Sequence, residues 1–263
     1  MRLHAVQTDP VWQDREANLA AIATTLSDLA PAAGDFVVLP EMCATAWTTE
    51  PSMHLDGHAT VERLGALAAR HGIWLQAGVG LPVEDDRVAN AAVVLAPDGS
   101  LRATYRKNFL FPVERDAFVA GDGLVLVDTG EAVVCPLVCY DLRFPELWRL
   151  AALAGAEVFT VSSAWPSPRI AHWRTLLAAR AIENQAWVVA SNRCGRDPKL
   201  EYGGRSAILD ERGGARAEAD AEAGPAALSS DLDRGSLDAW RAGFDALRDT
   251  RRSLLGDATI ARV

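Results

Sequence analysis

The chain has 263 residues, 49% of them hydrophobic and 23% charged, which is typical of a globular protein with a sizeable core. Its formal net charge of −9 argues against binding to nucleic acid or to an anionic membrane surface, because both present negative charge. No apolar run approaches the roughly 18 residues of a membrane span, and the N-terminal "MRLHAVQTDP" does not resemble an export signal. We therefore expect a cytoplasmic protein with no nucleic-acid or membrane partner.

Apolar runs along the chain predict strands, and helical patterns separate several of them. In the first half, strands are expected at 3–7, 36–40, 73–81 and 88–96, with helices after Asp14 and over 59–71. In the second half, strands are expected at 132–140, 157–165, 186–194 and 205–210, with helices over 146–154, 171–185 and 235–247. Several runs are apolar on both faces, which is typical of strands covered on both sides.

Turn signals and one polar loop lie between these elements. "APDGS" at 96–100 and "LDERGG" at 209–214 indicate turns between strands. The polar, alanine-rich segment at 216–227 is expected to be a loop. No Pro-, Gly- or Ser-rich linker divides the chain, so we predict one α/β domain over residues 1–263, with layered sheets and helices and mixed strand directions.

Patterns that hold a metal or a cofactor are missing from the sequence. Of the five histidines, only His54 and His58 share a helical spacing, and no H-E-x-x-H or C-x-x-C pair occurs. "GVGLPV" at 78–83 lacks the third glycine of a dinucleotide-binding loop. We therefore expect neither a metal site nor a cofactor.

The four cysteines, Cys43, Cys135, Cys139 and Cys194, follow no tight spacing pattern, and we expect reduced thiols. Cys139 comes directly after a buried strand, at the carboxyl end where α/β sheets place their active sites. Cys135 lies four residues earlier and would share the same face of a regular strand. Cys139 could be a nucleophile, or both thiols could fill space in the core, the commoner role of a free cysteine.

Two charged residues end other apolar segments. Glu41 stops the run "FVVLPE", and Lys107 follows an amphipathic strand that begins at residue 101. A carboxylate in such a position is costly to bury unless it is paired or hydrogen-bonded. Glu41 and Lys107 could form a structural ion pair at the rim of the sheet, or they could meet Cys139 as base, cation and nucleophile.

Three motifs in order, "VVLPE" at 37–41, "YRKNFLF" at 105–111 and "CYDLRFPE" at 139–146, resemble the nitrilase (carbon–nitrogen hydrolase) superfamily. The segments at 164–195 and 203–213 extend the match, which is most similar to the bacterial omega-amidases. The resemblance implies a four-layer αββα sandwich. It also implies a homodimer or a higher homo-oligomer, with the C-terminal tail, 235–263, in subunit contacts.

The resemblance also implies roles for five residues in amide hydrolysis. Cys139 would attack the amide carbon, while Glu41 would take the thiol proton and pass it to the departing ammonia. Lys107 and the backbone N–H of Tyr140 would donate to the oxyanion. Glu114, seven residues beyond Lys107, would be a second glutamate that orients the ammonium, and the alternative is an exposed loop carboxylate.

A carboxylate base for a thiol requires a tuned site. Reference pKa values of about 8.5 for cysteine and 4.3 for glutamate make the proton transfer uphill by roughly 5–6 kcal/mol. Burial can raise the pKa of a glutamate, and a neighbouring ammonium can lower that of a thiol. The assignment of Glu41 as base therefore depends on Lys107 lying close to Glu41 and Cys139.

Two residues are candidates for substrate binding. Arg143 could bind a substrate carboxylate through its planar guanidinium, or it could pair with Asp141 or Glu146 as a structural bridge. Trp165 could form a wall of the acyl pocket or pack in the core. Omega-amidases act on short dicarboxylic monoamides, so the resemblance implies a carboxylate-binding group.

Phe109 departs from the superfamily pattern, because many relatives have a histidine two residues after the lysine. The departure affects the expected polarity of the pocket and leaves hydrolysis intact. Cys43 is expected to pack in the core, although a disulfide with Cys139 would inactivate the enzyme if the two lie close together. The polar side chains of Arg180, Glu183 and Asn184 are expected to be scaffolding between helix and sheet.

The sequence thus predicts a thiol amidohydrolase whose partner is a small-molecule amide. The favoured substrate is an ω-amide of a 2-oxo dicarboxylic acid, of the 2-oxoglutaramate or 2-oxosuccinamate type, which is hydrolysed through a cysteine thioester. One alternative keeps the Glu-Lys-Cys machinery for an N-carbamoyl compound, an aliphatic amide or deaminated glutathione. Another alternative is a catalytically silent, partner-binding protein on the same fold.

Overall fold

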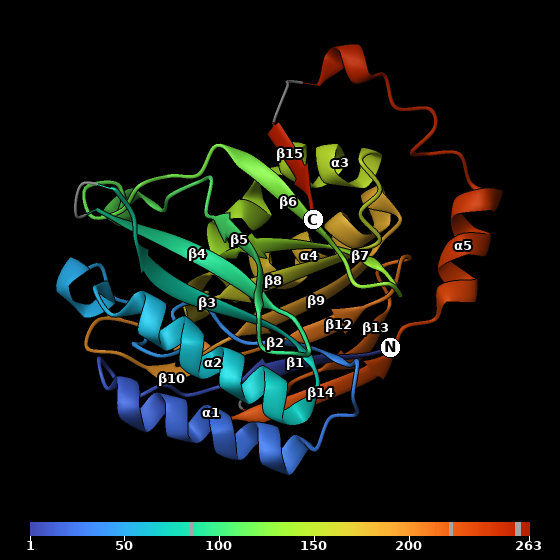
Figure 1. The fold of residues 1–263 in the computed structure, drawn as a ribbon. Coiled ribbons are helices and arrows are strands. Elements are labelled where there is room, and N and C mark those ends of the chain that lie inside the picture. The colour runs from blue at the N-terminus through green and yellow to red at the C-terminus, as the bar shows by residue number, and fades with distance from the viewer. Residues whose placement is uncertain (85–86, 221–222, 256–258) are drawn as a thin grey trace.

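The computed structural model describes residues 1–84, 87–220, 223–255 and 259–263, and two sheets packed face to face form its centre (Figure 1). One sheet has six strands in the order β14-β1-β2-β3-β4-β5, and the other has seven in the order β13-β12-β9-β8-β7-β6-β15. Helices α1 and α2 cover the first sheet, and α3 and α4 cover the second. The predicted four-layer αββα sandwich is confirmed.

The strands of the first sheet are β1 (Arg2–Gln7), β2 (Phe36–Val38), β3 (Trp74–Pro82), β4 (Val88–Leu95), β5 (Leu101–Arg106) and β14 (Ala226–Asp231). Those of the second are β6 (Gly123–Asp128), β7 (Val133–Val138), β8 (Val158–Ser163), β9 (Trp187–Asn192), β12 (Ala207–Leu209), β13 (Ala215–Glu218) and β15 (Thr259–Arg262). Strands β1, β2 and β3 are mutually parallel, as are β7, β8 and β9, whereas most of the outer pairs are antiparallel. The expected mixture of strand directions is therefore confirmed.

The long helices are α1 (Arg15–Leu29), α2 (Gly57–His71), α3 (Pro145–Leu153), α4 (Ile170–Asn184) and α5 (Arg234–Gly243). Helix α1 begins where the sequence predicts, because the Asp14 carboxylate accepts a hydrogen bond from the N–H of Ala17 at 3.0 Å. Helix α2 ends at Gly72, whose φ of +65° is favourable for glycine. Helix α5 is shorter than predicted, since Phe244 has an extended backbone.

Central strands are buried on both faces, which explains their continuous apolar runs. On β2, Phe36 and Val38 point into the core between the sheets, whereas Val37 packs in the core under α1 and α2. On β9, Trp187 contacts the inter-sheet core and Val188 belongs to the core under α3 and α4. Successive side chains of a central strand thus point alternately into the inter-sheet core and into the core between that sheet and its covering helices.

Polar edge strands account for most differences from the prediction. The segment 216–227 was expected to be a loop, but β13 extends to Glu218 and β14 begins at Ala226, while residues 221–222 lie outside the described part. Strand β14 pairs antiparallel with β1, and β13 pairs with β12. Backbone hydrogen bonds hold these strands, so their side chains show little apolar periodicity. Strands β6 and β15 and the hairpin of β10 (Cys194–Arg196) and β11 (Glu201–Gly203) were not predicted either.

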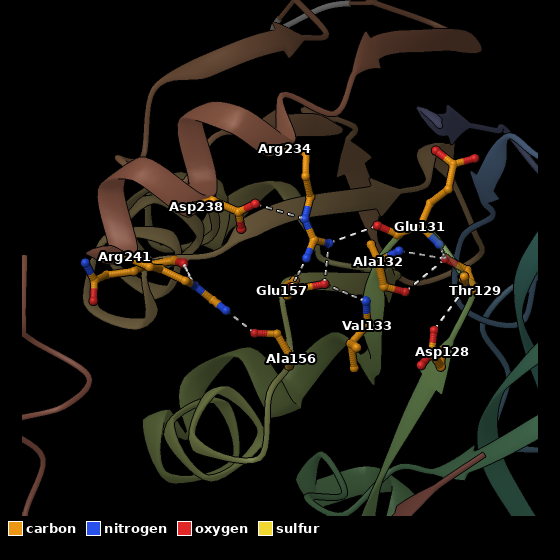
Figure 2. A network of polar contacts seen from close by, with 12 residues as sticks. Asp128, Thr129, Glu131, Ala132, Val133, Ala156, Glu157, Arg234, Asp238 and Arg241 are labelled. Carbon is orange, nitrogen blue, oxygen red and sulfur yellow. Dashed lines mark hydrogen bonds and ion pairs between the residues drawn. The ribbon is translucent and has the colours of Figure 1, made fainter. Parts of the chain in front are cut away.

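Helix α5 is fastened to its own chain by two arginines (Figure 2). The guanidinium of Arg234 donates to the carboxylate of Glu157 at 2.5 and 2.6 Å, and the same carboxylate accepts from the N–H of Val133 at 2.9 Å. Arg241 donates to the carbonyl of Ala156 at 2.7 Å. These contacts lie within one subunit, so the predicted role of 235–263 between subunits stays a prediction. Within the described ranges, no helix combines the length and apolar character that a membrane crossing requires.

Candidate active site

Three strand ends bring the predicted charged and nucleophilic side chains to one end of the inter-sheet layer. Glu41 follows β2 after two residues, Lys107 follows β5 directly, and Cys139 follows β7 directly. The Nζ atom of Lys107 lies 2.8 Å from Oε1 of Glu41, and the exposed fractions of these residues are 1% and 0%. The pair is therefore buried inside the molecule, and the alternative of an ion pair at the rim of the sheet is wrong.

Glu114 joins this pair from the 3₁₀ helix η3 (Pro112–Glu114). It is fully buried, and its Oε2 lies 2.8 Å from Nζ of Lys107, so the alternative of an exposed loop carboxylate is wrong. The side-chain amide of Asn90, on β4, donates to Glu41 at 2.7 Å and to Glu114 at 2.8 Å. One ammonium and one amide thus hold the two carboxylates together.

Backbone and indole N–H groups satisfy the remaining oxygens of the two carboxylates. Oε2 of Glu41 accepts from the N–H of Ala164 at 2.9 Å, and Oε2 of Glu114 accepts from the N–H of Phe111 at 2.7 Å. The indole of Trp47 donates to Oε1 of Glu114 at 3.1 Å. Buried charges remain stable only with such complete pairing. The carboxylates are therefore fixed in position.

Lys107 remains a cation in this environment. Burial favours the neutral amine, but the charges of Glu114 and Glu41 outweigh burial and raise the pKa of Lys107 above its ordinary value. Lys107 also lies at the wall of a cleft that Cys139 lines. The site therefore presents a permanent positive charge beside the sulfur.

Cys139 is the first residue of the 3₁₀ helix η4 (Cys139–Arg143) and has a φ of +42°. A non-glycine residue in this left-handed region costs of order 1–3 kcal/mol, and such strain is typical of functional positions. Burial and the charge of Glu41 raise the pKa of the Cys139 thiol, although Lys107 acts in the opposite direction. The lowering of the Cys139 pKa that Lys107 alone would cause is therefore outweighed.

Cys135 and Cys43 lie in apolar cores. Cys135 is fully buried within β7, and Cys43 is buried under α1 and α2. Cys139 follows the end of β7 at Val138 and packs against the same apolar cluster to which Cys135 belongs. All four cysteines are free thiols in the structure.

Asp141 fixes the turn that carries Cys139. Its carboxylate accepts from the hydroxyl of Tyr105 at 2.9 Å, from the N–H of Phe109 at 3.0 Å and from the N–H of Val138 at 3.1 Å. Burial raises the pKa of Asp141 to about 7, against the lowering effect of these hydrogen bonds. The turn after β7 is thus tied to the segment that carries Lys107.

Helix α4 supports the same turn from the other side. The guanidinium of Arg180 donates to the carbonyl of Leu142 at 2.9 and 3.1 Å and to Glu183 at 2.8 Å. The amide of Asn184 donates to the carbonyl of Arg180 at 2.9 Å. Arg180 thus ties α4 to the turn, whereas these contacts of Glu183 and Asn184 lie within α4, so the predicted role between helix and sheet stays a prediction.

Cys139 lines a cleft that is open to solvent. Its lining combines aromatic and cationic side chains, namely Trp47, Lys107, Phe111, Tyr140, Arg143, Trp165, Arg169 and Tyr202, together with Cys139, Ala164, Pro166 and Leu200. Tyr140, whose backbone N–H is a predicted oxyanion donor, is among them. The lining suits a small molecule that carries both apolar and anionic groups.

Arg143 lies in this cleft with its guanidinium carbon 4.6 Å from the ring centroid of Trp165. Within the described residues, it pairs with neither Asp141 nor Glu146, so the alternative of a structural bridge is wrong. Trp165 is 2% exposed and both lines the cleft and packs against Trp173 in the core. Both interpretations of Trp165 therefore hold.

Phe109, the departure from the superfamily pattern, stacks on Phe144 with ring centroids 3.5 Å apart. It is not among the residues that line the cleft in the described part of the chain. Phe144 in turn makes an edge contact with Tyr140. The substitution therefore affects the packing behind the cleft wall.

Two supporting residues were missed in the sequence. Asn90 interrupts the apolar run "VANAAVVLA", and a buried amide in such a strand needs partners, so this signal was available. The sequence indicates Asp141 only as a possible partner of Arg143, because two of its donors, the Tyr105 hydroxyl and the Phe109 N–H, come from a distant segment. Across the described ranges, no group of three or more His, Cys, Asp or Glu side chains is arranged to hold a metal ion.

Comparison with known proteins agrees with this geometry. The family model "Carbon-nitrogen hydrolase" matches residues 2–242. A 2-oxoglutaramate amidase of Paenarthrobacter nicotinovorans is 35% identical over 87% of this chain and 83% of its own length. Omega-amidase YafV of Yersinia enterocolitica is 35% identical over 97% of this chain and 98% of its own.

A solved structure is also similar over nearly the whole chain. It is a mutant of the amidase from Nesterenkonia sp. AN1, showing the result of Michael addition of acrylamide at the active site cysteine. The match has a TM-score of 0.84 and 26% identity, and it covers 97% of this chain and 98% of that chain.

Proposed function

The chain belongs to the carbon–nitrogen hydrolase family and is an amidase, and we propose that it hydrolyses the terminal amide of a short 2-oxo dicarboxylic acid through a thioester on Cys139. The substrates would be of the 2-oxoglutaramate or 2-oxosuccinamate type. One observation carries the proposal: a permanently charged Lys107, bracketed by two buried carboxylates, lies beside a cysteine at the base of a cationic cleft.

In the first half-reaction, the sulfur of Cys139 bonds to the amide carbon while Glu41 takes the thiol proton. Because burial and the charge of Glu41 raise the pKa of the Cys139 thiol, the attack needs a base that accepts the thiol proton. The tetrahedral oxygen gains negative charge next to the ammonium of Lys107 and the N–H of Tyr140. When the C–N bond breaks, Glu41 returns the proton to nitrogen, and ammonia leaves.

In the second half-reaction, Glu41 takes a proton from water, and the resulting hydroxide equivalent attacks the thioester carbon. The C–S bond breaks, the sulfur recovers its proton, and the free acid is released. The same two donors stabilise the second oxyanion. Loss of one such donor typically costs roughly 3–4 kcal/mol of transition-state stabilisation.

Three side chains give the substrate its direction. Lys107, Cys139 and Arg143 line the same cleft. Lys107 and Cys139 would act on the amide, and the guanidinium of Arg143 would bind the carboxylate. The relatives named 2-oxoglutaramate amidase and omega-amidase support a substrate of this class. Glu114 would hold Lys107 in place through its ion pair.

Ammonia release from 2-oxoglutaramate and 2-oxosuccinamate tests the substrate class. We expect a kcat/KM at least tenfold above that for neutral aliphatic amides, which have no carboxylate for the arginine-lined cleft. We expect the same margin over N-carbamoyl acids and deaminated glutathione, which carry a carboxylate but have no terminal carboxamide to cleave; cleavage of deaminated glutathione is followed by the release of cysteinylglycine. A higher kcat/KM for any other class would contradict the proposed substrate. Carbamoyl substrates are recognised by the CO₂ released with ammonia.

Mass spectrometry of acid-quenched enzyme tests the mechanism. The wild-type protein is expected to carry the acyl group on the peptide that contains Cys139, and Cys139→Ala is expected to carry none and to release no ammonia. Turnover by Cys139→Ala would contradict the thioester mechanism. Circular dichroism of the variant serves as the folding control.

A further inference from the structure

We propose that Arg169 is a second specificity-determining arginine, which acts with Arg143 as a two-guanidinium site for the carboxylate of the substrate. The inference rests on the proposed function and deepens it. Arg143 ends η4, and Arg169 ends the 3₁₀ helix η5 (Ser167–Arg169), immediately before α4. Both side chains are half-buried and line the same cleft.

The charge of the cleft is opposite to that of the chain. The chain carries 35 acidic residues and 26 lysines and arginines. Yet the lining within the described residues contains three cations, Lys107, Arg143 and Arg169, and no carboxylate. The charge of Lys107 is compensated by its ion pairs with Glu41 and Glu114, so the two arginines carry the uncompensated charge of the lining.

The side-chain geometry leaves guanidinium donors free. The guanidinium of Arg143 stacks over Trp165 at 4.6 Å, and that of Arg169 stacks over Phe111 at 5.3 Å. Stacking occupies the face of a guanidinium, whereas its N–H groups lie in the plane of the group. Among the described residues, neither arginine has a carboxylate partner, and Arg143 has one side-chain contact, at 3.4 Å to Nδ1 of His172.

The two like charges act on each other. Burial lowers the pKa of Arg143, and the charge of Arg169 lowers it further. An anion between the two guanidiniums would relieve this repulsion, since each group can donate two parallel hydrogen bonds to a carboxylate. By the same argument, an ammonium next to that carboxylate is disfavoured, so a 2-oxo acid fits this site better than the corresponding amino acid.

Short terminal amides with and without a carboxylate test the role of Arg169. The panel consists of 2-oxoglutaramate, glutaramate, which lacks the oxo group, and pentanamide, which lacks the carboxylate. For Arg169→Gln, we expect the ratio of kcat/KM for the two charged amides to that for pentanamide to fall roughly 10- to 100-fold, mainly through KM. Arg169→Lys should lie between the two, since it keeps the charge and loses the planar donors.

Arg174→Gln is the matched control, because Arg174 lies on α4, is exposed and pairs with Glu218 away from the cleft. It should leave the ratio at its wild-type value. An equal loss of kcat/KM on all three amides in Arg169→Gln, or an unchanged ratio, would overturn the assignment.

A binding measurement separates this inference from the proposed substrate. Calorimetric titration of Cys139→Ala with 2-oxoglutarate requires no turnover, and adding Arg169→Gln should weaken binding roughly 10- to 100-fold. Undiminished binding would refute the role of Arg169 even if 2-oxoglutaramate is a good substrate. Failure of the wild-type enzyme to hydrolyse either charged amide, with arginine-dependent binding intact, would refute only the proposed reaction.

Discussion

Replacement of Asn90 by leucine, which has a similar shape, tests how the buried charge cluster is held together. Asn90 is fully buried, and its amide donates to Glu41 and Glu114 at 2.7 and 2.8 Å. Hydrogen bonds to charged groups contribute about 1.5–3 kcal/mol each, so the loss of two amounts to about 3–6 kcal/mol. Leucine avoids the free-energy cost of burying a polar amide, which stabilises the variant by about 1–3 kcal/mol. The difference spans about 0–5 kcal/mol, and we expect Asn90→Leu to lower the free energy of unfolding by about 2–3 kcal/mol, near the centre of that span.

The same variant should also slow the reaction. Glu41 would keep its bonds to Lys107 and to the N–H of Ala164 but lose the donor that fixes the plane of its carboxylate. Small misplacements of a reacting group can cost up to about 100-fold, so we expect kcat to fall roughly 10- to 100-fold with a smaller change in KM. Urea denaturation followed by circular dichroism and steady-state ammonia release measure the two effects.

Gln76→Met is the matched control. Gln76 is a fully buried amide on the neighbouring strand β3, but it is hydrogen-bonded to the neutral hydroxyls of Ser162 and Thr160. Its replacement should cost only about 0–2 kcal/mol and leave kcat within about twofold of the wild-type value. The reasoning is refuted if Asn90→Leu retains wild-type kcat or loses no more stability than Gln76→Met.

Three further substitutions test the cluster and its support. Glu41→Gln, which keeps the shape and removes the base, should lower kcat about 10²- to 10⁴-fold in the ammonia assay. Arg180→Met, which frees the carbonyl of Leu142, should destabilise the protein by about 1–3 kcal/mol in urea and lower kcat, and an unchanged kcat would show that the turn holds without it. Burial raises the pKa of Asp141 to about 7, so the folded state retains a proton that the unfolded state releases near its reference pKa of about 3.9. The free energy of unfolding should therefore fall by up to about 4 kcal/mol as the pH rises from about 4 to about 7. Asp141→Asn should flatten this dependence in urea titrations across the window, and a slope equal to that of the wild type would contradict the sign.

The position of the site was predictable from the sequence because it depends on where apolar strands end. Glu41, Lys107 and Cys139 each follow a strand within three residues, and carboxyl ends of strands are where such folds place reactive groups. Periodicity also gave the central strands and the first four long helices, since both faces of each central strand must be apolar. Strand ends, buried strands and amphipathic helices each depend on the order of residues within a short segment, so a short segment is enough to predict them.

Features that depend on distant pairing were not predictable in this way. The strands β13, β14 and β15 are held by backbone hydrogen bonds to a neighbour, so their polar sequences give no alternation to detect. Asp141 binds donors from two other segments, which no spacing rule relates to it. The direction of the net shift in the pKa of Cys139 required the depth of its burial, which competes with the charge of Lys107.

The arrangement of charge explains how Lys107 can be fully buried and still remain a cation. Because Lys107 is paired with two carboxylates, it stays charged without making the cluster positive. These ion pairs offset the desolvation free energy of the buried ammonium in the absence of substrate. Arg143 and Arg169 have no such partners in the described part of the chain and remain available to an anion. A substrate that is neutral at one end and anionic at the other therefore finds one lysine with carboxylate partners and two arginines without them in the same cleft. This difference would place the amide, and not the carboxylate, next to Cys139.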